Sequence, residues 1–376
     1  MNRIHFVDYA KALAIFCVVA VHVGFYQINL MLLFVMPMFF VATGYSFNPT
    51  KRSLKENILL RFKTIMIPFW IYMGIYTIVE LIRAPIFGYG SWKVLFSSLA
   101  NLVYGSGYIP GKVGFISLLK DIMSYKFQPI TSVDIILPSN CHLWFLPAMF
   151  VGYVLFIVVE KFTREKNLLK IISIIILLLV ASLEVEFASI CQLPYGIGRG
   201  AIGACFMLVG FEIKKNGLLT KNSFLFHLIT CIFAVAICAV SIYLGSDGSA
   251  MVRSYYGPYG ALSVFITFVG GVAGTWITFE LCQGIEKLPF TVVKKFLSFA
   301  GKNVITIYLL HMAVKFIFDF TYIFVFNKGN EIFLDEYKMG LLPENSFFYM
   351  MFEVILIIFV CLIFTKQKER LKRIGC

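Results

Sequence analysis

The stretch VDYAKALAIFCVVAVHVG, residues 7–24, decides the fold class of this chain. It is apolar and close in length to a membrane span, which needs about 20 predominantly apolar residues. It nevertheless carries three ionisable side chains, with Asp8 and Lys11 near its start and His22 near its end. Such groups in a membrane helix indicate either anchoring at the interface or a functional site.

Composition extends this conclusion to the whole chain, which has 376 residues, of which 60% are hydrophobic and only 14% are charged. Soluble domains average about 25% charged residues. Apolar runs of spanning length recur at approximately 9–27, 30–47, 65–83, 143–160, 169–185, 197–213, 224–244, 259–280, 303–326 and 346–364. We therefore expect an all-α polytopic integral membrane protein with about ten transmembrane helices, forming one membrane domain over 1–376 with no appended soluble domain.

The net charge of +13 is distributed in a way that sets orientation and argues against nucleic-acid binding. Most Lys and Arg residues fall in short segments on one side of an alternating ten-span topology, and acidic residues such as Glu184 fall in the loops of the other side. Basic loops are cytoplasmic under the positive-inside rule. Both termini are therefore expected in the cytoplasm, and the first apolar run is expected to be a permanent span and not a cleaved signal peptide.

One long outward segment, residues 84–142, departs from the pattern of short loops. SWKVLFSSLANLVYG (91–105) and GFISLLKDIMSYKF (114–127) within it are typical of short amphipathic helices at the membrane interface. A long ordered loop more often forms a lid or a vestibule over a site than a simple connection between two elements.

The nine cysteines show no spacing typical of a metal site, so no metal is expected. Most lie inside apolar runs, where a thiol behaves as a small apolar side chain. Cys141 and Cys191 fall in predicted outward loops, where they could pair or remain two unrelated free thiols.

The spacing in the first span places its ionisable groups at two different depths in the membrane. Asp8 and Lys11 lie one helical turn apart and can pair, whereas His22 is about 21 Å beyond Asp8 at 1.5 Å per residue. Asp8 and Lys11 then lie at the cytoplasmic surface. One interpretation is that they have no function beyond anchoring the helix at the interface. His22 lies in the outer half of the membrane, where it could simply bond between helices.

The ninth predicted span, GKNVITIYLLHMAVKFIFDF (301–320), carries a second set of ionisable groups. His311, Lys315 and Asp319 follow at i, i+4 and i+8, so they share one helical face. The pattern favours a polar stripe facing an internal cavity. The alternative is a Lys315–Asp319 pair at the interface with an incidental His311.

Two further groups lie at span ends. Arg61 and Lys63 belong to a basic cluster at the start of the third span, which either sets topology or binds the phosphates of a polyanionic ligand. His142 and Trp144 open the fourth span at the outer interface, where aromatic residues are ordinary but where Trp144 could also stack on a sugar ring.

The ordered set of motifs resembles the membrane acyltransferase-3 family, in the branch similar to fucose 4-O-acetylases and polysaccharide O-acetyltransferases. Asp8, Lys11 and His22 keep the family's spacing of an acid, a basic residue and a histidine, with Lys where the family more often has Arg. The segments MFFVATGYSF, RFKTIMIPFW, LWFLPAMF and GKNVITIYLLH follow in the family's order over nearly the whole chain.

The resemblance implies an enzyme that moves an acyl group, usually acetyl, from cytoplasmic acyl-CoA to a hydroxyl of an extracytoplasmic glycan at the cell membrane. It implies a catalytic role for His22. The proposed catalytic set also contains Asp8, which can position Lys11, and His311 from the polar face of the ninth span. The basic residues Lys11, Arg61 and Lys63 are expected to bind the CoA phosphates, and His142, Trp144, Lys315 and Asp319 the acceptor.

A mechanism follows from this placement. Lys11 and His22 are about 16 Å apart along the helix, which is comparable to the reach of a pantetheine arm. Neutral His22 can act as general base on the acceptor hydroxyl, or as a nucleophile that carries the acyl group. The competing hypothesis is an exporter of polysaccharide or another solute, in which the intramembrane His, Lys and Asp residues line a transport path.

Overall fold

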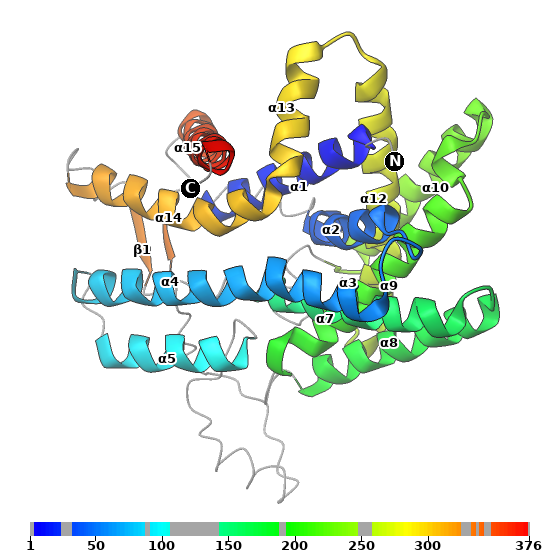
Figure 1. The fold of residues 1–376 in the computed structure, drawn as a ribbon, viewed down its shortest axis with the longest axis horizontal. Coiled ribbons are helices and arrows are strands. Elements are labelled where there is room, and N and C mark those ends of the chain that lie inside the picture. The colour runs from blue at the N-terminus through cyan, green and yellow to red at the C-terminus, as the bar shows by residue number, and fades with distance from the viewer. Residues whose placement is uncertain are drawn as a thin grey trace, which may run out of the picture. The chain divides into compact units, whose positions relative to one another are not determined.

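The computed structural model describes residues 4–23, 32–86, 91–105, 143–187, 193–246, 258–324, 332–335, 338–341 and 347–374. Helices account for nearly all of these residues, and the predicted all-α polytopic membrane class is confirmed (Figure 1). Two strands, β1 (Ile332–Asp335) and β2 (Lys338–Leu341), pair antiparallel in a short hairpin.

The longer helices in chain order are α1 (His5–Val23), α2 (Leu32–Ser46), α3 (Leu54–Arg61), α4 (Ile67–Ile86), α5 (Ser91–Tyr104), α7 (Phe145–Thr163), α8 (Asn167–Phe187), α9 (Ile197–Lys215), α10 (Phe224–Tyr243), α12 (Ala261–Lys287), α13 (Thr291–Lys302), α14 (Val304–Phe324) and α15 (Phe347–Ile374). Short helical turns of other types join them: η2 (Phe62–Met66), η4 (Pro194–Gly196) and η5 (Leu218–Thr220).

Each of the ten predicted spans coincides with one of these helices. Among the described residues, seven helices are long and apolar enough to cross a membrane, or up to eight if the bent pair α13–α14 counts as one span. In α2 and α15 the described apolar segments, Leu33–Ser46 and Val354–Gln367, are shorter. The count of ten and the cytoplasmic placement of both termini stay predictions.

The chain divides into two compact units, each of which is described by itself. Unit 1 comprises Met1–Ala42, Gly217–Tyr243 and Val269–Cys376. Unit 2 comprises Thr43–Asn216 and Leu244–Phe268. The two histidines predicted in the membrane, His22 and His311, therefore belong to unit 1, whereas the basic cluster at the start of the third predicted span belongs to unit 2.

In unit 1, α1 packs closely against α13, and this contact explains a glycine of the GKN motif. A Cβ atom added to Gly301 would lie 1.9 Å from the carbonyl oxygen of Asp8, so only glycine allows the two backbones to approach this closely. Further along the same pair of helices, the rings of Phe16 and Phe296 stack with centroids 5.6 Å apart.

The chain turns sharply after this contact, with α13 and the following helix α14 bent by 84°. Asn303 lies at the corner, and its side-chain amide donates to the carbonyl of Phe299 at 2.9 Å. This bond satisfies a carbonyl that the end of α13 leaves without a helical partner. The predicted span at 303–326 therefore begins as a new helix and not as a continuation of α13.

In unit 2, small residues bring α7 and α9 together, as is common between membrane helices. A Cβ atom at Gly152 would lie 2.9 Å from the carbonyl oxygen of Gly200, and one at Gly200 would lie 2.7 Å from the side chain of Val151. Helix α8 packs against α9, and α5 lies along α4 (Figure 1). The predicted helix at 91–105 is thus confirmed by α5, whereas 114–127 lies outside the described residues.

The third predicted span contains an irregular turn with an identifiable cause. Pro68 has no N–H, and its ring excludes a regular α-helical turn before it. The chain forms the π-helical turn η2 at this point, in which the N–H of Ile67 donates to the carbonyl of Phe62. Lys63 lies in this turn and Arg61 directly precedes it, and π turns in α-helices often occur at functional sites.

Candidate active site

Two histidines that are 289 residues apart in sequence meet in unit 1. His22 comes from α1 and His311 from α14, and these two helices are in contact. Nε2 of His311 lies 3.2 Å from Nδ1 of His22, and the ring centroids are 4.9 Å apart. His311 is fully buried at 0% exposure, and His22 is partly buried.

The hydrogen bonds to backbone carbonyls determine which nitrogen of each ring carries the proton. Nδ1 of His311 lies 2.6 Å from the carbonyl of Tyr308, and Nδ1 of His22 lies 2.9 Å from the carbonyl of Val18. A carbonyl oxygen only accepts, so Nδ1 donates in both rings. In the neutral pair, Nε2 of His311 is then an acceptor for the N–H of His22.

This tautomer places the lone pair of His22 on its Nε2 atom. A base whose other nitrogen is held by a hydrogen-bond acceptor has the arrangement found in nucleophile–base–orienter triads. His311 supplies the orienting acceptor in place of a carboxylate. The pair can therefore take a proton at Nε2 of His22 and stabilise the resulting positive charge through Nε2 of His311.

Asp8 lies at the opposite end of α1, beside Lys11 and not beside the histidines. The Asp8 carboxylate is 2.9 Å from the Lys11 ammonium, and its side chain is 6% exposed whereas that of Lys11 is 27% exposed. The pairing predicted from their spacing is confirmed. The separation from His22 is about 21 Å along the helix, so Asp8 lies too far from His22 to orient it directly.

Lys315 lies one turn after His311 on α14, and its side chain is 3% exposed. On the opposite face of the same helix, Ile317 is 65% exposed, so Lys315 lies on the packed face of α14. Asp319 lies in α14 as predicted, but its side chain is outside the described residues.

The basic cluster in unit 2 is held by an aromatic side chain. The guanidinium carbon of Arg61 lies 4.7 Å from the centre of the Tyr153 ring, and the Tyr153 hydroxyl donates to Asn57 at 3.3 Å. Lys63 is exposed. The arrangement keeps the Arg61 charge next to an aromatic face, a favourable cation–π contact.

Trp144 is buried at 5% exposure, and the guanidinium carbon of Arg199 lies 4.9 Å from the centre of its ring. The structure therefore places a protein cation, and not solvent, over one face of the ring predicted to stack on a sugar. His142 lies outside the described residues.

Arg199 and Glu184 were not recognised as buried polar residues in the sequence. Arg199 is 0% exposed on α9, and Glu184 is 3% exposed in α8, with its carboxylate next to Gly198 and Arg199 at the start of α9. The expectation that Glu184 lies in a loop is wrong, because α8 extends to Phe187. The signal for Arg199 was present, since an arginine inside the predicted span 197–213 is a functional-site candidate by default.

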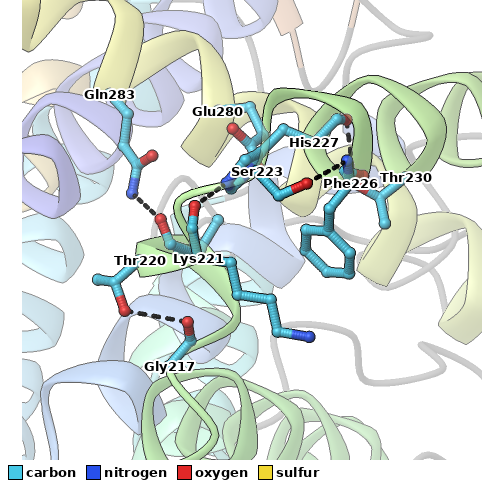
Figure 2. A network of polar contacts seen from close by, with 10 residues as sticks. Gly217, Thr220, Lys221, Ser223, Phe226, His227, Thr230, Glu280 and Gln283 are labelled. Carbon is cyan, nitrogen blue, oxygen red and sulfur yellow. Dashed lines mark hydrogen bonds and ion pairs between the residues drawn. The ribbon is translucent and has the colours of Figure 1, made fainter.

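A second polar cluster of unit 1, shown in Figure 2, lies at the start of α10 and near the end of α12. Nδ1 of His227 lies 2.6 Å from Glu280, and Nε2 lies 2.8 Å from the carbonyl of Lys221. Both nitrogens therefore donate when Glu280 is ionised, which makes the ring an imidazolium. Gln283 adds a bond to the carbonyl of Leu219 at 3.1 Å. The cluster ties α10 to α12.

Among the described residues, no group of three or more His, Cys, Asp or Glu side chains could hold a metal ion. The described cysteines are free thiols at positions 17, 205, 231, 238, 282 and 361. Cys141 and Cys191, the predicted candidates for a disulfide, lie outside the described residues.

Comparison with known proteins adds one result to this geometry. A family model described as an acyltransferase domain, that of the acyltransferase-3 family, matches residues 4–366. Searches of curated proteins and of solved structures returned no match. Since the family match covers nearly the whole chain and includes both histidines of the pair, the chain belongs to the acyltransferase-3 family and is a multi-pass membrane acyltransferase.

Proposed function

We propose that this acyltransferase moves an acetyl group from cytoplasmic acetyl-CoA to a hydroxyl of an extracytoplasmic glycan, in the cytoplasmic membrane of the cell. The resemblance to fucose 4-O-acetylases and polysaccharide O-acetyltransferases supports the choice of donor and acceptor. The observation that carries the proposal is the hydrogen-bonded pair of His22 and His311 in a chain of this family.

In the proposed reaction, Nε2 of His22 removes the proton of the acceptor hydroxyl as its oxygen adds to the thioester carbonyl carbon. The carbonyl electron pair moves to oxygen and gives a tetrahedral oxyanion. The oxyanion then collapses, the C–S bond breaks, and the CoA thiolate takes the proton from His22. The products are an acetyl ester and CoA with a free thiol, and His22 returns to its neutral form.

The proposed binding site for acetyl-CoA consists of the cations near the predicted cytoplasmic surface. Lys11, held by Asp8, is proposed to contact a CoA phosphate, with the pantetheine arm following α1 over the roughly 16 Å to His22. Arg61 and Lys63 are proposed as further phosphate contacts from unit 2. Because the two groups belong to different units, each is to be tested on its own.

The acceptor end is proposed to lie beyond the His pair on α14. The described part of that helix continues from His311 through the buried Lys315 to the turn that carries Asp319. His142 and Trp144 are proposed as acceptor contacts because they open the fourth predicted span at its outer end, where Trp144 could stack on a sugar ring. Arg199 covers one face of the Trp144 ring, so the proposed sugar contact is with the other face.

The test uses purified protein in lipid vesicles, acetyl-CoA labelled in its acetyl group, and glycan extracted from cells that lack the protein. We expect labelled acetyl to appear on the glycan with stoichiometric release of free CoA. His22→Ala should abolish transfer, because the base is gone. His5→Gln, on the same helix and exposed, is the matched control and should retain activity.

Full transfer by a stably folded His22→Ala variant would overturn the base assignment. An exporter would instead move glycan across the vesicle membrane without consuming acetyl-CoA. That result would replace the proposed function with the transport hypothesis.

A further inference from the structure

Lys315 is a buried lysine one helical turn after His311, a member of the histidine pair. Lys315 follows His311 by four residues, so the two side chains lie on one face of α14 with Cβ atoms about 6 Å apart. The Lys315 side chain is 3% exposed and His311 is 0% exposed. An ionisable group at such a position in a membrane protein is costly and is a functional-site candidate by default.

The usual direction of helical side chains favours a placement of the Lys315 amine toward the histidine pair. In an α-helix the Cα–Cβ bond is tilted toward the N-terminus, and a long side chain covers the turn that precedes its own residue. For Lys315 that preceding turn is the one that carries His311. A lysine side chain that follows this general direction carries its amine toward the turn of His311, and His311 lies 3.2 Å from His22.

A negative charge forms at this level during the proposed reaction. The reacting hydroxyl must come within about 3 Å of Nε2 of His22 for proton transfer. The thioester carbonyl carbon bonds to that hydroxyl oxygen, and the carbonyl oxygen that becomes the oxyanion is attached to this carbon. The oxyanion therefore forms within a few bond lengths of the histidine pair, inside the reach of a four-carbon side chain from the next turn.

We propose that the ammonium group of Lys315 stabilises the oxyanion of the tetrahedral intermediate, a role that rests on the proposed function. When the hydroxyl oxygen adds to the carbonyl carbon and His22 takes the proton, the negative charge on the former carbonyl oxygen is held by Lys315. When the C–S bond breaks, the C=O bond re-forms and the thiolate recovers the proton from His22. Lys315 keeps its own proton throughout.

A cation suits this role better than acceptor binding, the role that the polar face of the ninth predicted span indicates for Lys315. An acceptor hydroxyl is neutral in the ground state and gains little from a full positive charge. The oxyanion is charged only in the intermediate and in the transition states that flank it, and groups that stabilise such charge in a water-excluded site raise kcat. The burial of Lys315 among protein side chains provides that environment.

The experiment measures kcat and both KM values for Lys315→Met and Lys315→Arg with acetyl-CoA and the extracted glycan. Lys315→Met removes the charge and keeps the length of the side chain, so kcat should fall about 10²–10³-fold with both KM values nearly unchanged. Lys315→Arg keeps the charge and should retain more activity than Lys315→Met. Lys295→Met, at an exposed position of α13, is the control that should behave as wild type.

A second readout does not depend on how much of the variant folds. Fluorine on the acyl group withdraws electrons and stabilises the oxyanion chemically, so the deficit of Lys315→Met relative to wild type should be smaller with fluoroacetyl-CoA than with acetyl-CoA. If Lys315→Met yields no folded protein, the ratio of wild-type to variant kcat is measured with both acyl donors for Lys315→Arg. Because the charge of this variant is displaced and not removed, we expect a smaller loss of kcat, which is again smaller with fluoroacetyl-CoA than with acetyl-CoA.

Two results would overturn the role of Lys315 while the proposed function stands. One is an unchanged kcat with a raised KM for the glycan, which would assign Lys315 to acceptor binding. The other is an equal deficit with both acyl donors. If the wild-type protein itself transfers no acetyl group and binds no CoA, the proposed function fails instead, and the two failures are distinguished by the wild-type measurement alone.

Discussion

His311 is a residue whose importance follows from one contact, its 3.2 Å approach to His22. Replacing it by Phe keeps an aromatic ring at the buried position and removes the acceptor that orients His22. We expect kcat for acetyl transfer to fall by about 10²–10⁴-fold, the usual range for general acid–base catalysis, with acetyl-CoA affinity unchanged. Steady-state kinetics of the His311→Phe variant measure kcat, and titration with CoA measures the affinity. A KM effect without a loss of kcat would contradict the orienting role.

Lys11 can be tested for CoA binding separately from the histidine pair. Its partner Asp8 is buried, whereas its own side chain is partly exposed and accessible to a ligand. Lys11→Met should weaken CoA binding about 10–100-fold, the value of one hydrogen bond between charged groups. Lys11→Arg should retain affinity, since Arg also pairs with phosphate. Titration calorimetry with CoA measures both, and Lys161→Met, exposed at the end of α7, serves as the control. Equal affinity in wild type and Lys11→Met would remove Lys11 from the donor site.

At the scale of the element, the contact between α1 and α13 depends on Gly301. Gly301→Ala places a Cβ atom 1.9 Å from the carbonyl oxygen of Asp8. That oxygen belongs to the backbone of α1, so the clash is relieved only if the two helices move apart. We expect a loss of about 1–3 kcal/mol or more in stability, as for other overpacked sites. The matched control is Gly284→Ala in α12, where an added Cβ meets nothing within 4 Å. Thermal unfolding in detergent should separate the two variants, and an unchanged Tm for Gly301→Ala would contradict the close packing.

The cluster of Figure 2 makes a prediction for the pair α10 and α12. His227 and Glu280 form a partly buried ion pair, with side chains 20% and 16% exposed. A double-mutant cycle with His227→Phe and Glu280→Gln should give a coupling energy of about 0.5–3 kcal/mol, the range for residues in direct contact. Neither variant should change the rate of acetyl transfer per folded molecule. Strictly additive effects on stability would show that the contact does not hold the two helices together.

At the scale of the whole molecule, the charge pattern predicts an even number of spans. Tags placed at the two ends of the chain should therefore both be protected from protease added outside intact cells, and both should be cleaved after the membrane is opened. Cleavage of one tag in intact cells would mean an odd number of spans. Among the described residues, the number of spans depends on the bent pair α13–α14 and on the shorter apolar segments of α2 and α15.

Much of the architecture could be predicted from sequence, because a bilayer imposes length and apolarity on each span. All ten predicted spans coincide with helices, and the Asp8–Lys11 pair follows from its spacing. Long-range contacts could not be predicted in this way. Nothing local indicates that His22 meets His311, 289 residues away, or that Asn303 marks an 84° bend.

The buried groups missed in the sequence have a similar explanation. Glu184 was assigned to a loop because hydropathy falls where α8 ends, although the helix continues and buries the side chain. Arg199 lies among Gly and Ala residues in a stretch that resembles ordinary helix packing, although the position of an arginine inside a span is the relevant signal.

The central claim is that His22 and His311 act as one catalytic unit, and the kinetics of the double variant test it most directly. Transfer of labelled acetyl from acetyl-CoA is measured for wild type, His22→Ala, His311→Ala and the double variant, each normalised to folded protein. Residues that act as a unit give strongly non-additive losses. The double variant should therefore be no slower than His22→Ala alone. Losses that multiply, or a double variant with substantial activity, would contradict the account.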